Sequence, residues 1–275
     1  MTCATLKDVF KKNRAVAGLV VLGWEDAKAY VEAAEETGIA IVLQAGPGVR
    51  KYTPIPILGK MFRHLAEQAS VPIVCHIDHA TSLQECLEGI DNGFTSVMID
   101  GSQLSIFENI ELTRSVVEHA QRTGVSVEGE IGQVGYTAGA ASHFTSPEEA
   151  RRFELESGVD ALAISVGNVH LNTEKTNGID FEALRAIEAV TKSPLVLHGG
   201  SGIPFEIRRK LVTESRVAKF NFGTELRQAF GTALRQSLKN QPDVFDRLQL
   251  LGPTIPALRE AAKVSIYSVA GDVSR

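Results

Sequence analysis

The sequence lacks an excess of positive charge, long apolar runs and paired cysteines, and each absence excludes a class of protein. Its 28 Lys and Arg stand against 33 Asp and Glu, a formal net charge of −5, so no basic footprint for nucleic acid is present. No apolar run approaches the ~18 residues of a membrane span, and the N-terminus lacks the charged-then-apolar layout of a secretory signal. The three cysteines, Cys3, Cys75 and Cys86, form no close pair in sequence, which predicts free thiols in the cytoplasm. A small molecule is therefore the expected partner.

Apolar runs and amphipathic stretches alternate through the chain without a linker between them. The runs predict buried strands at residues 15–22, 39–44, 71–76, 96–99, 125–131, 161–165, 195–197 and 217–220. Helical periodicity predicts helices at residues 5–14, 24–37, 57–70, 82–92, 106–123, 146–158, 180–191 and 225–240, and one or two more from residue 242 that finish near Val264. The pattern predicts one α/β domain over residues 1–275, a (β/α)8 TIM barrel with extra N- and C-terminal helices; a doubly wound open sheet is the competing arrangement.

Ionisable residues gather where the predicted strands end. The run Val71-Pro-Ile-Val-Cys-His-Ile-Asp-His79 brings three of them within four residues, and alternation along a strand points His79 away from His76 and Asp78 unless the chain turns. Later strands are followed by further polar residues, namely Asp100, Glu130, His170, His198 and Asn221. Barrel enzymes build their sites from this edge of the barrel, so the placement favours the barrel over the open sheet.

Three histidines on separate predicted strands give the ligand set of a catalytic Zn²⁺ site. His79, His170 and His198 would bind the ion and leave one position open for water or substrate. Imidazole sites also accept other divalent ions. Asp100 and Glu130 would either orient these ligands or hold a second divalent or monovalent cation, and a structural role as hydrogen-bond acceptors is equally open.

Two glycine-containing turns follow the last two predicted strands. Each turn leads into a helix, so backbone N–H groups and a helix N-terminus can approach an anion. Barrels commonly hold phosphate at these two loops. The predicted phosphate cradle consists of Gly199, Gly200 and Ser201 in the first turn and Asn221, Phe222, Gly223 and Thr224 in the second.

Six motifs in order over nearly the whole chain resemble those of the class II, zinc-dependent ketose-bisphosphate aldolase family, which includes fructose- and tagatose-bisphosphate aldolases. They are Val71-Pro-Ile-Val-Cys-His-Ile-Asp-His79, Ser96-Val-Met-Ile-Asp-Gly-Ser102, Val127-Glu-Gly-Glu-Ile-Gly132, Val166-Gly-Asn-Val-His170, Leu197-His-Gly-Gly-Ser-Gly-Ile-Pro204 and Lys219-Phe-Asn-Phe-Gly-Thr-Glu225. The resemblance implies zinc at His79, His170 and His198, and Asp78 as acid/base. It also implies a secondary metal position at Asp100 and Glu130, and dihydroxyacetone phosphate in the cradle.

The resemblance further implies a reaction and an assembly. Zn²⁺ would polarise the carbonyl of a ketose phosphate and stabilise the enediolate, while Asp78 takes the C4 hydroxyl proton as the C3–C4 bond breaks. The products would be dihydroxyacetone phosphate, or a related ketone, and an aldehyde. The enzyme would be a cytoplasmic homodimer or homotetramer. A zinc-dependent hydrolase with Asp78 or Glu130 as base, and a non-catalytic aldolase-like subunit, are the alternatives.

Four departures from the family pattern concern the lid and the aldehyde side. Leu171 replaces a glycine after the second zinc histidine, and Gly46 replaces a serine that contacts the aldehyde product's phosphate. The segment Leu22-Gly-Trp-Glu25 lacks the usual asparagines. The candidate lid at residues 132–145 has no carboxylate between Gly135 and His143, which leaves His143 or Tyr136 as substitutes or an ordinary loop. We therefore expect aldolase chemistry with an unusual aldehyde.

Overall fold

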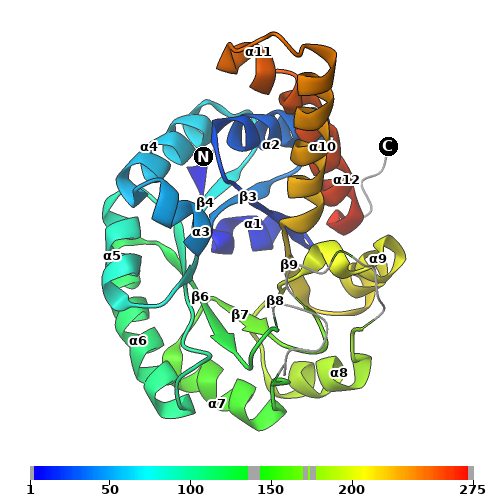
Figure 1. Cartoon of the computed structure of the whole chain (residues 1–275). Coiled ribbons are helices and arrows are strands. Elements are labelled where there is room, and N and C mark those ends of the chain that lie inside the picture. Colours follow the sequence, from blue (N-terminus) through cyan, green and yellow to red (C-terminus); the bar gives the residue numbers. More distant parts are fainter. Residues whose placement is uncertain (1–2, 136–142, 170–172, 174–177, 272–275) are drawn as a thin grey trace.

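A closed barrel of parallel strands forms the centre of the molecule, as the alternating pattern predicts (Figure 1). The computed structural model describes residues 3–135, 143–169, 173 and 178–271. The ring runs β2 (Val16–Val20), β3 (Ile41–Ala45), β4 (Ile73–Ala80), β5 (Ser96–Ile99), β6 (Ser126–Ile131), β7 (Ala161–Ile164), β8 (Leu195–Leu197) and β9 (Val217–Phe222). It closes because β9 pairs with β2 and β4 pairs with β5. The competing open sheet is excluded.

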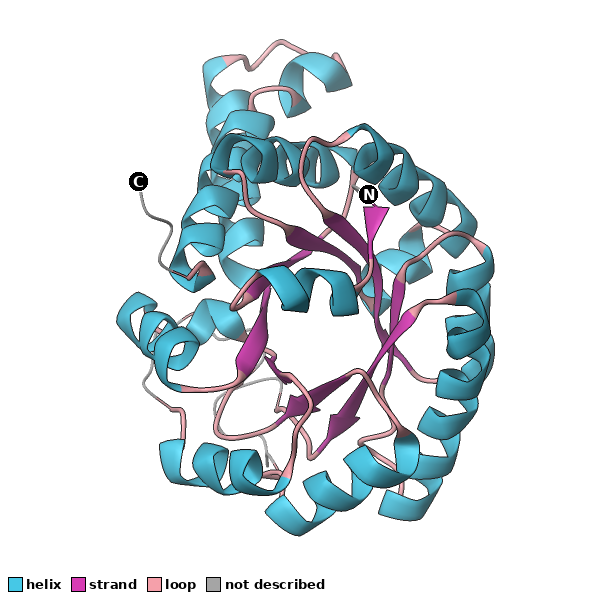
Figure 2. Ribbon diagram, turned by 180° about the vertical axis from the view of Figure 1, so that it is seen from behind, coloured by secondary structure: helices cyan, strands magenta, loops and turns pink. Residues whose placement is uncertain are grey.

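Helices surround the barrel, and most of them follow a strand (Figures 1 and 2). They are α2 (Trp24–Thr37), α3 (Pro47–Tyr52), α4 (Ile55–Gln68), α5 (Leu83–Asp91), α6 (Ile106–Thr123), α7 (Pro147–Ser157), α8 (Phe181–Val190), α9 (Phe205–Glu214), α10 (Thr224–Asn240), α11 (Arg247–Leu251) and α12 (Thr254–Val269). Local signals define their ends: Ser105 and Glu108 form a capping box at the start of α6, and Gly124 ends it at φ 72°.

The N-terminal segment closes one end of the barrel (Figure 2). Strand β1 (Cys3–Ala4) pairs with β4, and Thr5 caps α1 (Leu6–Lys12). Leu6 and Val9 of α1 are buried with the barrel side chains Val16, Val42, Val74, Met98, Ala161, Ala163 and Val196. Because this apolar plug fills one end, polar side chains are left to the other, carboxyl end of the strands.

The third predicted strand is longer than the sequence indicates. It continues past His76 to Ala80, because pairing between β4 and β5 resumes after an irregularity between Ile77 and Ala80. The two-residue β1 and the short helix α3 were not predicted from the sequence. At the other end of the chain, α12 runs to Val269 instead of finishing near Val264.

Pairing of β1 with β4 also brings together two cysteines that are far apart in sequence. Cys3 and Cys75 share a thiol hydrogen bond, which lowers the pKa of Cys3 to about 7. Cys3, Cys75 and Cys86 are all free thiols. The prediction of free thiols holds, although two of them are neighbours.

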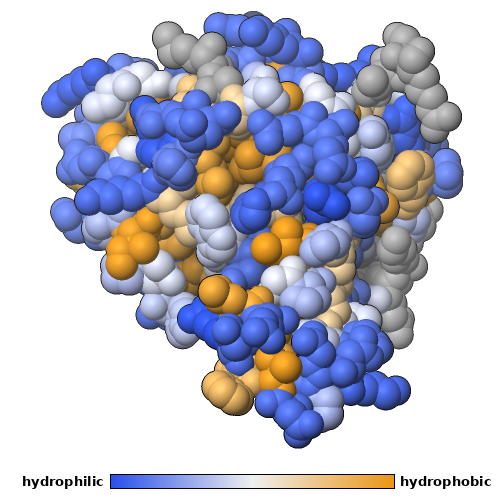
Figure 3. Space-filling view, turned by 90° about the horizontal axis from the view of Figure 1, so that it is seen from above, coloured by the Kyte–Doolittle hydropathy of each residue, from blue (hydrophilic) through white to orange (hydrophobic). Residues whose placement is uncertain are grey.

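Helices α10 and α11 project from the barrel wall (Figure 1). Viewed from their side, the surface is largely hydrophilic, with hydrophobic patches between (Figure 3). Phe245, which precedes α11, is 95% exposed, and Leu248 on α11 is 78% exposed. Among the described residues, no helix is long and apolar enough to cross a lipid bilayer.

Candidate active site

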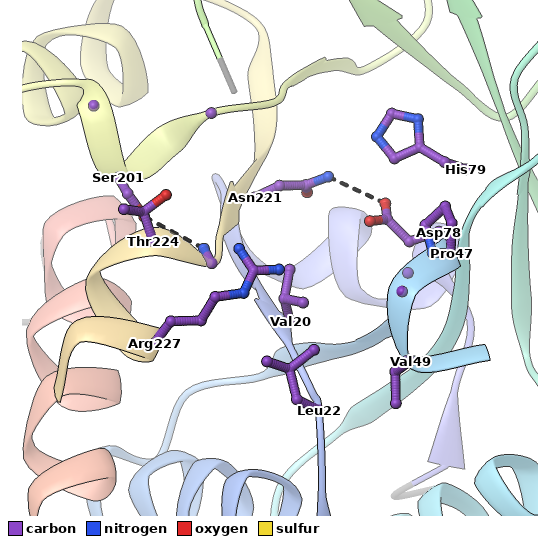
Figure 4. Close-up of a pocket in the computed structure, with 15 residues that line it drawn as sticks. Val20, Leu22, Pro47, Val49, Asp78, His79, Ser201, Asn221, Thr224 and Arg227 are labelled. Carbon is purple, nitrogen blue, oxygen red and sulfur yellow. Dashed lines mark hydrogen bonds between the residues drawn. The ribbon is translucent and has the colours of Figure 1, made fainter. Parts of the chain in front are cut away.

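Asp78 and His79 reach the same cavity because the end of β4 is irregular. The β4–β5 register shifts between Ile77 and Ala80, and His79 has φ 50°, alone among the described non-glycine residues in having a positive φ. A positive φ in a non-glycine residue costs about 1–3 kcal/mol of conformational free energy, and it persists only where the surrounding structure enforces it. In a regular strand, Asp78 and His79 would point to opposite faces. The irregularity turns the backbone so that both side chains line one cavity of about 270 Å³ (Figure 4).

Two imidazoles meet above this cavity. His198 follows β8, and its Nδ1 lies 2.8 Å from Nε2 of His79, with the two rings 4.5 Å apart and nearly perpendicular. One ligand atom from each of Asp78, His79 and His198 lies within 4.8 Å of the other two. His170, the third histidine predicted to bind zinc, lies outside the described residues, as do Leu171 and residues 136–142 of the candidate lid.

Carboxylates hold the far side of the His79 ring. Nδ1 of His79 lies 2.7 Å from Asp100 and 3.4 Å from Glu130, which leaves Nε2 facing His198. Burial raises the pKa of Asp100, but the hydrogen bonds with His79 and Ser102 outweigh it and hold that pKa well below its usual value. The carboxyl groups of Asp100 and Glu130 therefore lie where they orient His79.

A buried ion pair holds the His198 ring from within the barrel. Nε2 of His198 lies 3.1 Å from Glu128, whose other oxygen accepts a 2.7 Å hydrogen bond from Lys219. Glu128 and Lys219 are fully buried. Neither residue is among the predicted site residues. Glu128 stands two positions before Glu130 on the same strand, and Lys219 interrupts an apolar strand; these are the signals that could have identified them.

His76 does not join the imidazole pair. Its Nδ1 lies 2.8 Å from the Ser96 hydroxyl, in the barrel interior, and its Nε2 has no hydrogen-bond partner. Burial, together with the nearby Lys219 ammonium, holds its pKa well below the usual range. His76 is therefore an interior side chain of the barrel, and the turn after it gathers two of the three ionisable residues.

The electrostatics between the two rings favour a cation. Burial disfavours charge on His79, yet Asp78, Asp100 and Glu130 together raise its pKa to about 10. Burial raises the pKa of Glu130 to about 8, and its Oε2 is buried without a hydrogen-bond partner. Facing imidazole nitrogens, with their other nitrogens on carboxylates, match the donor set of a divalent transition-metal ion. The residues present fit such an ion.

The Asp78 carboxylate is fixed from the other side of the barrel. Gln44 donates a 2.8 Å hydrogen bond to its Oδ1, and Asn221 donates another at 3.4 Å. The Arg50 guanidinium donates to the carbonyl groups of Ala45, Asp78 and His79. Neither Gln44 nor Arg50 is among the predicted site residues, because each is a single polar residue and the Asp78 group that it contacts lies on β4.

The predicted phosphate cradle forms one end of the cavity (Figure 4). Ser201, in the turn Gly200–Gly202, accepts hydrogen bonds of 3.3 Å from the backbone N–H groups of Gly223 and Glu225, where α10 begins. Residues of the predicted cradle that line the cavity are Gly199, Ser201, Asn221, Gly223 and Thr224. Gly200 packs against Asn221 and Phe222, and the buried Phe222 ring lies under the Arg208 guanidinium, so these two support the cradle from behind.

The fold and these side chains define a (β/α)8 barrel with a candidate metal site and an anion cradle at the carboxyl ends of its strands. Residues 1–271 match the family model described as fructose-bisphosphate aldolase class-II. The fructose-bisphosphate aldolase of Staphylococcus epidermidis is 34% identical over 270 residues, which cover 95% of this chain and 93% of that protein. The 6-phospho-5-dehydro-2-deoxy-D-gluconate aldolase of Bacillus subtilis is 32% identical over 280 residues, which cover 98% of this chain and 96% of that protein.

Solved structures agree with the sequence relatives. The crystal structure of the YdjI aldolase from Escherichia coli K12 superposes with a TM-score of 0.84 at 30% identity and covers 98% of this chain and 96% of that one. The crystal structure of a putative fructose-1,6-biphosphate aldolase from Coccidioides immitis superposes with a TM-score of 0.80 at 27% identity and covers 96% of this chain and 95% of that one. The chain therefore belongs to the class II fructose-bisphosphate aldolase family. It is a metal-dependent lyase, and its family acts on sugar phosphates.

Proposed function

We propose that this aldolase is zinc-dependent and cleaves a ketose monophosphate or a modified sugar phosphate. The products are dihydroxyacetone phosphate, or a related ketone, and an aldehyde without a terminal phosphate. The observation that carries the proposal is Gly46, which lines the cavity beside Asp78. A Cβ there would lie 3.7 Å from Asp78 Oδ2, in ordinary contact, so a serine has room but its hydroxyl is missing. The ketone-side cradle keeps Ser201 and the backbone N–H groups at the start of α10.

Histidines 79, 170 and 198 are the proposed zinc ligands, and the bound ion would supply Lewis acidity toward the substrate carbonyl. The proximity of His79 and His198 and the carboxylates behind them support this assignment. Asp100 and Glu130 are proposed to orient His79. A second cation beside them remains our second proposal for this pair, supported by the grouping of His79, Asp100 and Glu130.

Asp78 is the proposed acid/base. Gln44 and Asn221 hold its Oδ1, while a Cβ at position 46 would approach Oδ2 from the cavity. Oδ2 therefore faces the space in which the C4 hydroxyl of a ketose would lie, with its phosphate in the cradle. Asp78 would accept the hydroxyl proton as the C3–C4 bond breaks, and would return it during condensation.

Two ketose phosphates that differ only in the second phosphate test the substrate. We expect a higher kcat/KM for fructose 1-phosphate than for fructose 1,6-bisphosphate, because a phosphate contact is missing at position 46. The Gly46→Ser variant places a hydroxyl at this position, and it should raise kcat/KM for fructose 1,6-bisphosphate relative to that for fructose 1-phosphate. Preferential cleavage of fructose or tagatose bisphosphate by the unmodified enzyme would contradict the proposal.

We also propose a cytoplasmic homo-oligomer, a dimer or tetramer. The three free thiols support the location, and the exposed Phe245 and Leu248 support an interface at the projecting α10–α11 arm. Light scattering coupled to gel filtration gives the mass of the assembly. Replacing both side chains with Ser should shift it toward the monomer.

A further inference from the structure

A second cavity of about 630 Å³ adjoins the one that contains Asp78. Three side chains, Val20, Leu22 and Arg227, line both cavities. In Figure 4, Ser201 and Thr224 lie at one end of the first cavity and Asp78 and His79 at the other, with Arg227, Val20 and Leu22 along the side between them. A substrate held in the first cavity can therefore extend past Arg227 into the second.

Arg227 is a cation directed into this junction. It stands in the first turns of α10, and a Cβ at Gly223 would lie 3.0 Å from its Nη1. Its backbone N–H donates to the Gly223 carbonyl group, but its guanidinium forms no hydrogen bond or ion pair with the part of the chain that the structure describes. The nearby carboxylate of Asp26 instead accepts hydrogen bonds from the backbone N–H groups of Leu22 and Gly23, at 2.8 and 3.0 Å. The guanidinium thus has its donors free for a ligand.

The lining of the second cavity indicates the size and charge of that ligand. Aromatic and aliphatic side chains dominate the wall, among them Trp24 and Tyr52, and a volume near 630 Å³ suits a group larger than a three-carbon aldehyde. Two arginines, Arg227 and Arg247, and two acidic residues, Glu25 and Asp26, line this cavity. Because the two carboxylates offset the two guanidinium groups, the wall has no excess positive charge to balance a phosphate dianion, whereas a monoanion needs only the Arg227 guanidinium. A guanidinium pairs well with a carboxylate in two parallel hydrogen bonds.

We propose that the part of the substrate released as aldehyde extends into this second cavity and carries a carboxylate that binds Arg227. The inference rests on the proposed aldolase function, and it names the class of acceptor: an aldehyde acid longer than three carbons. Arg227 is a specificity-determining residue, separate from the proposed acid/base and metal ligands. The cradle at Ser201 and Gly223 keeps the ketone phosphate.

The test condenses dihydroxyacetone phosphate with three aldehydes of four carbons each: 4-oxobutanoate, uncharged butanal and 4-oxobutyl phosphate. With the zinc-loaded enzyme we expect kcat/KM for 4-oxobutanoate to exceed that for each of the others at least about ten-fold, as one charge-assisted pair provides. Arg227→Gln should abolish this preference and Arg227→Lys should retain part of it. The KM for dihydroxyacetone phosphate should not change in either variant.

Arg235 supplies the matched control, because it is exposed on the same helix and lines neither cavity. Arg235→Gln should leave the preference intact. Equal rates with all three aldehydes, a preference for the phosphate, or an increased KM for dihydroxyacetone phosphate in Arg227→Gln would overturn the inference while leaving aldol chemistry in place. Failure of the unmodified enzyme to join dihydroxyacetone phosphate to any aldehyde, glycolaldehyde included, would instead overturn the proposed function and the inference with it.

Discussion

Each of the two imidazoles described at the proposed metal site has a carboxylate partner on the side of its ring away from the other imidazole. His79 lines the cavity and Asp100 lies behind it; His198 faces His79 and Glu128 lies behind it. A carboxylate behind an imidazole fixes the tautomer and raises the basicity of the nitrogen that faces the metal. Changes to the residue behind should therefore affect metal affinity, whereas changes to Asp78 should affect chemistry.

The Asp78→Ala variant separates these two effects. The variant should retain zinc, because His79 and His198 and their carboxylate partners are unchanged, but it should lose cleavage by about 10²–10⁴-fold through loss of the proton acceptor. Metal content by atomic absorption and kcat with the preferred ketose phosphate measure the two quantities. Near-normal turnover by a zinc-loaded variant would remove Asp78 from its proposed role.

Glu128 gives a second prediction at the same scale. Glu128→Gln should weaken zinc binding about 10–100-fold, since Gln holds His198 less well. It should also destabilise the fold by about 3–5 kcal/mol, because Lys219 is left as a buried, unpaired cation. Competition with a chelator measures the affinity, and urea denaturation measures the stability.

The Lys219→Met change on the Glu128→Gln background distinguishes positioning from simple loss of stability. The double variant contains no buried charge at this pair, so it should recover most of the lost stability but not the lost zinc affinity. Recovery of both would show that Glu128 acts only through the stability of the barrel interior.

At the scale of secondary structure, the strand-to-helix turns position the functional groups. The turn after β8 places Ser201 against the backbone at the start of α10. Gly200 permits this contact, because a Cβ there would lie 2.9 Å from the Asn221 carbonyl oxygen and 3.0 Å from the Phe222 ring. Neither atom is the far end of a flexible side chain, so the turn itself would shift.

Gly200→Ala should therefore displace the cradle. We expect the KM for dihydroxyacetone phosphate in condensation to rise roughly ten-fold, because phosphate positioning is lost, while zinc content is unchanged. The matched control is Gly231→Ala within α10, where the added Cβ meets only the mobile end of Arg235. The control should keep the KM and gain about 0.5–1 kcal/mol of stability. An unchanged KM in Gly200→Ala would show that the turn does not hold phosphate.

The barrel was predictable because its signals are local. Apolar runs and helical periodicity locate every strand of the ring, and capping residues such as Ser105 mark helix ends. The two-residue β1 and the six-residue α3 were missed because segments of that length carry too little periodicity. The length of β4 was underestimated because its last residues are polar and lie beyond a register shift that only the neighbouring strand β5 creates.

The site was predictable only in part, for a related reason. Asp78, His79 and His198 stand at strand ends, where the barrel rule applies. Gln44, Glu128 and Lys219 point into the barrel from the middle or end of strands, and each is bonded to a residue at least 34 positions away in sequence. Only the closure of the ring brings such partners together.

At the scale of the whole molecule, the proposed metal site joins the carboxyl ends of β4, β5, β6 and β8 across the barrel mouth. A ligand that binds only the folded state stabilises it, by about 2.7 kcal/mol at a concentration of 100 Kd. Removal of zinc with a chelator should therefore lower Tm by about 5–10 °C without unfolding the protein at room temperature, because the apolar plug and core are independent of the site.

Calorimetry before and after zinc is restored measures this coupling. The double variant His79→Ala with His198→Ala should show no increase in Tm with zinc, whereas His119→Ala, on the outer helix α6, should respond like the unmodified protein. A response of the double variant equal to that of the control would place the metal elsewhere.

The most direct test of the central proposal is the mass spectrum of a reaction between dihydroxyacetone phosphate and glycolaldehyde in H₂¹⁸O, with zinc-loaded and with metal-free protein. We predict a product that contains the carbon atoms of both reactants and keeps the phosphate, with a mass equal to their sum apart from carbonyl oxygens exchanged with the solvent; it should form with the zinc-loaded protein and be lost on chelation. Release of phosphate that carries ¹⁸O, with no product of the summed mass, would contradict the proposal and identify a hydrolase.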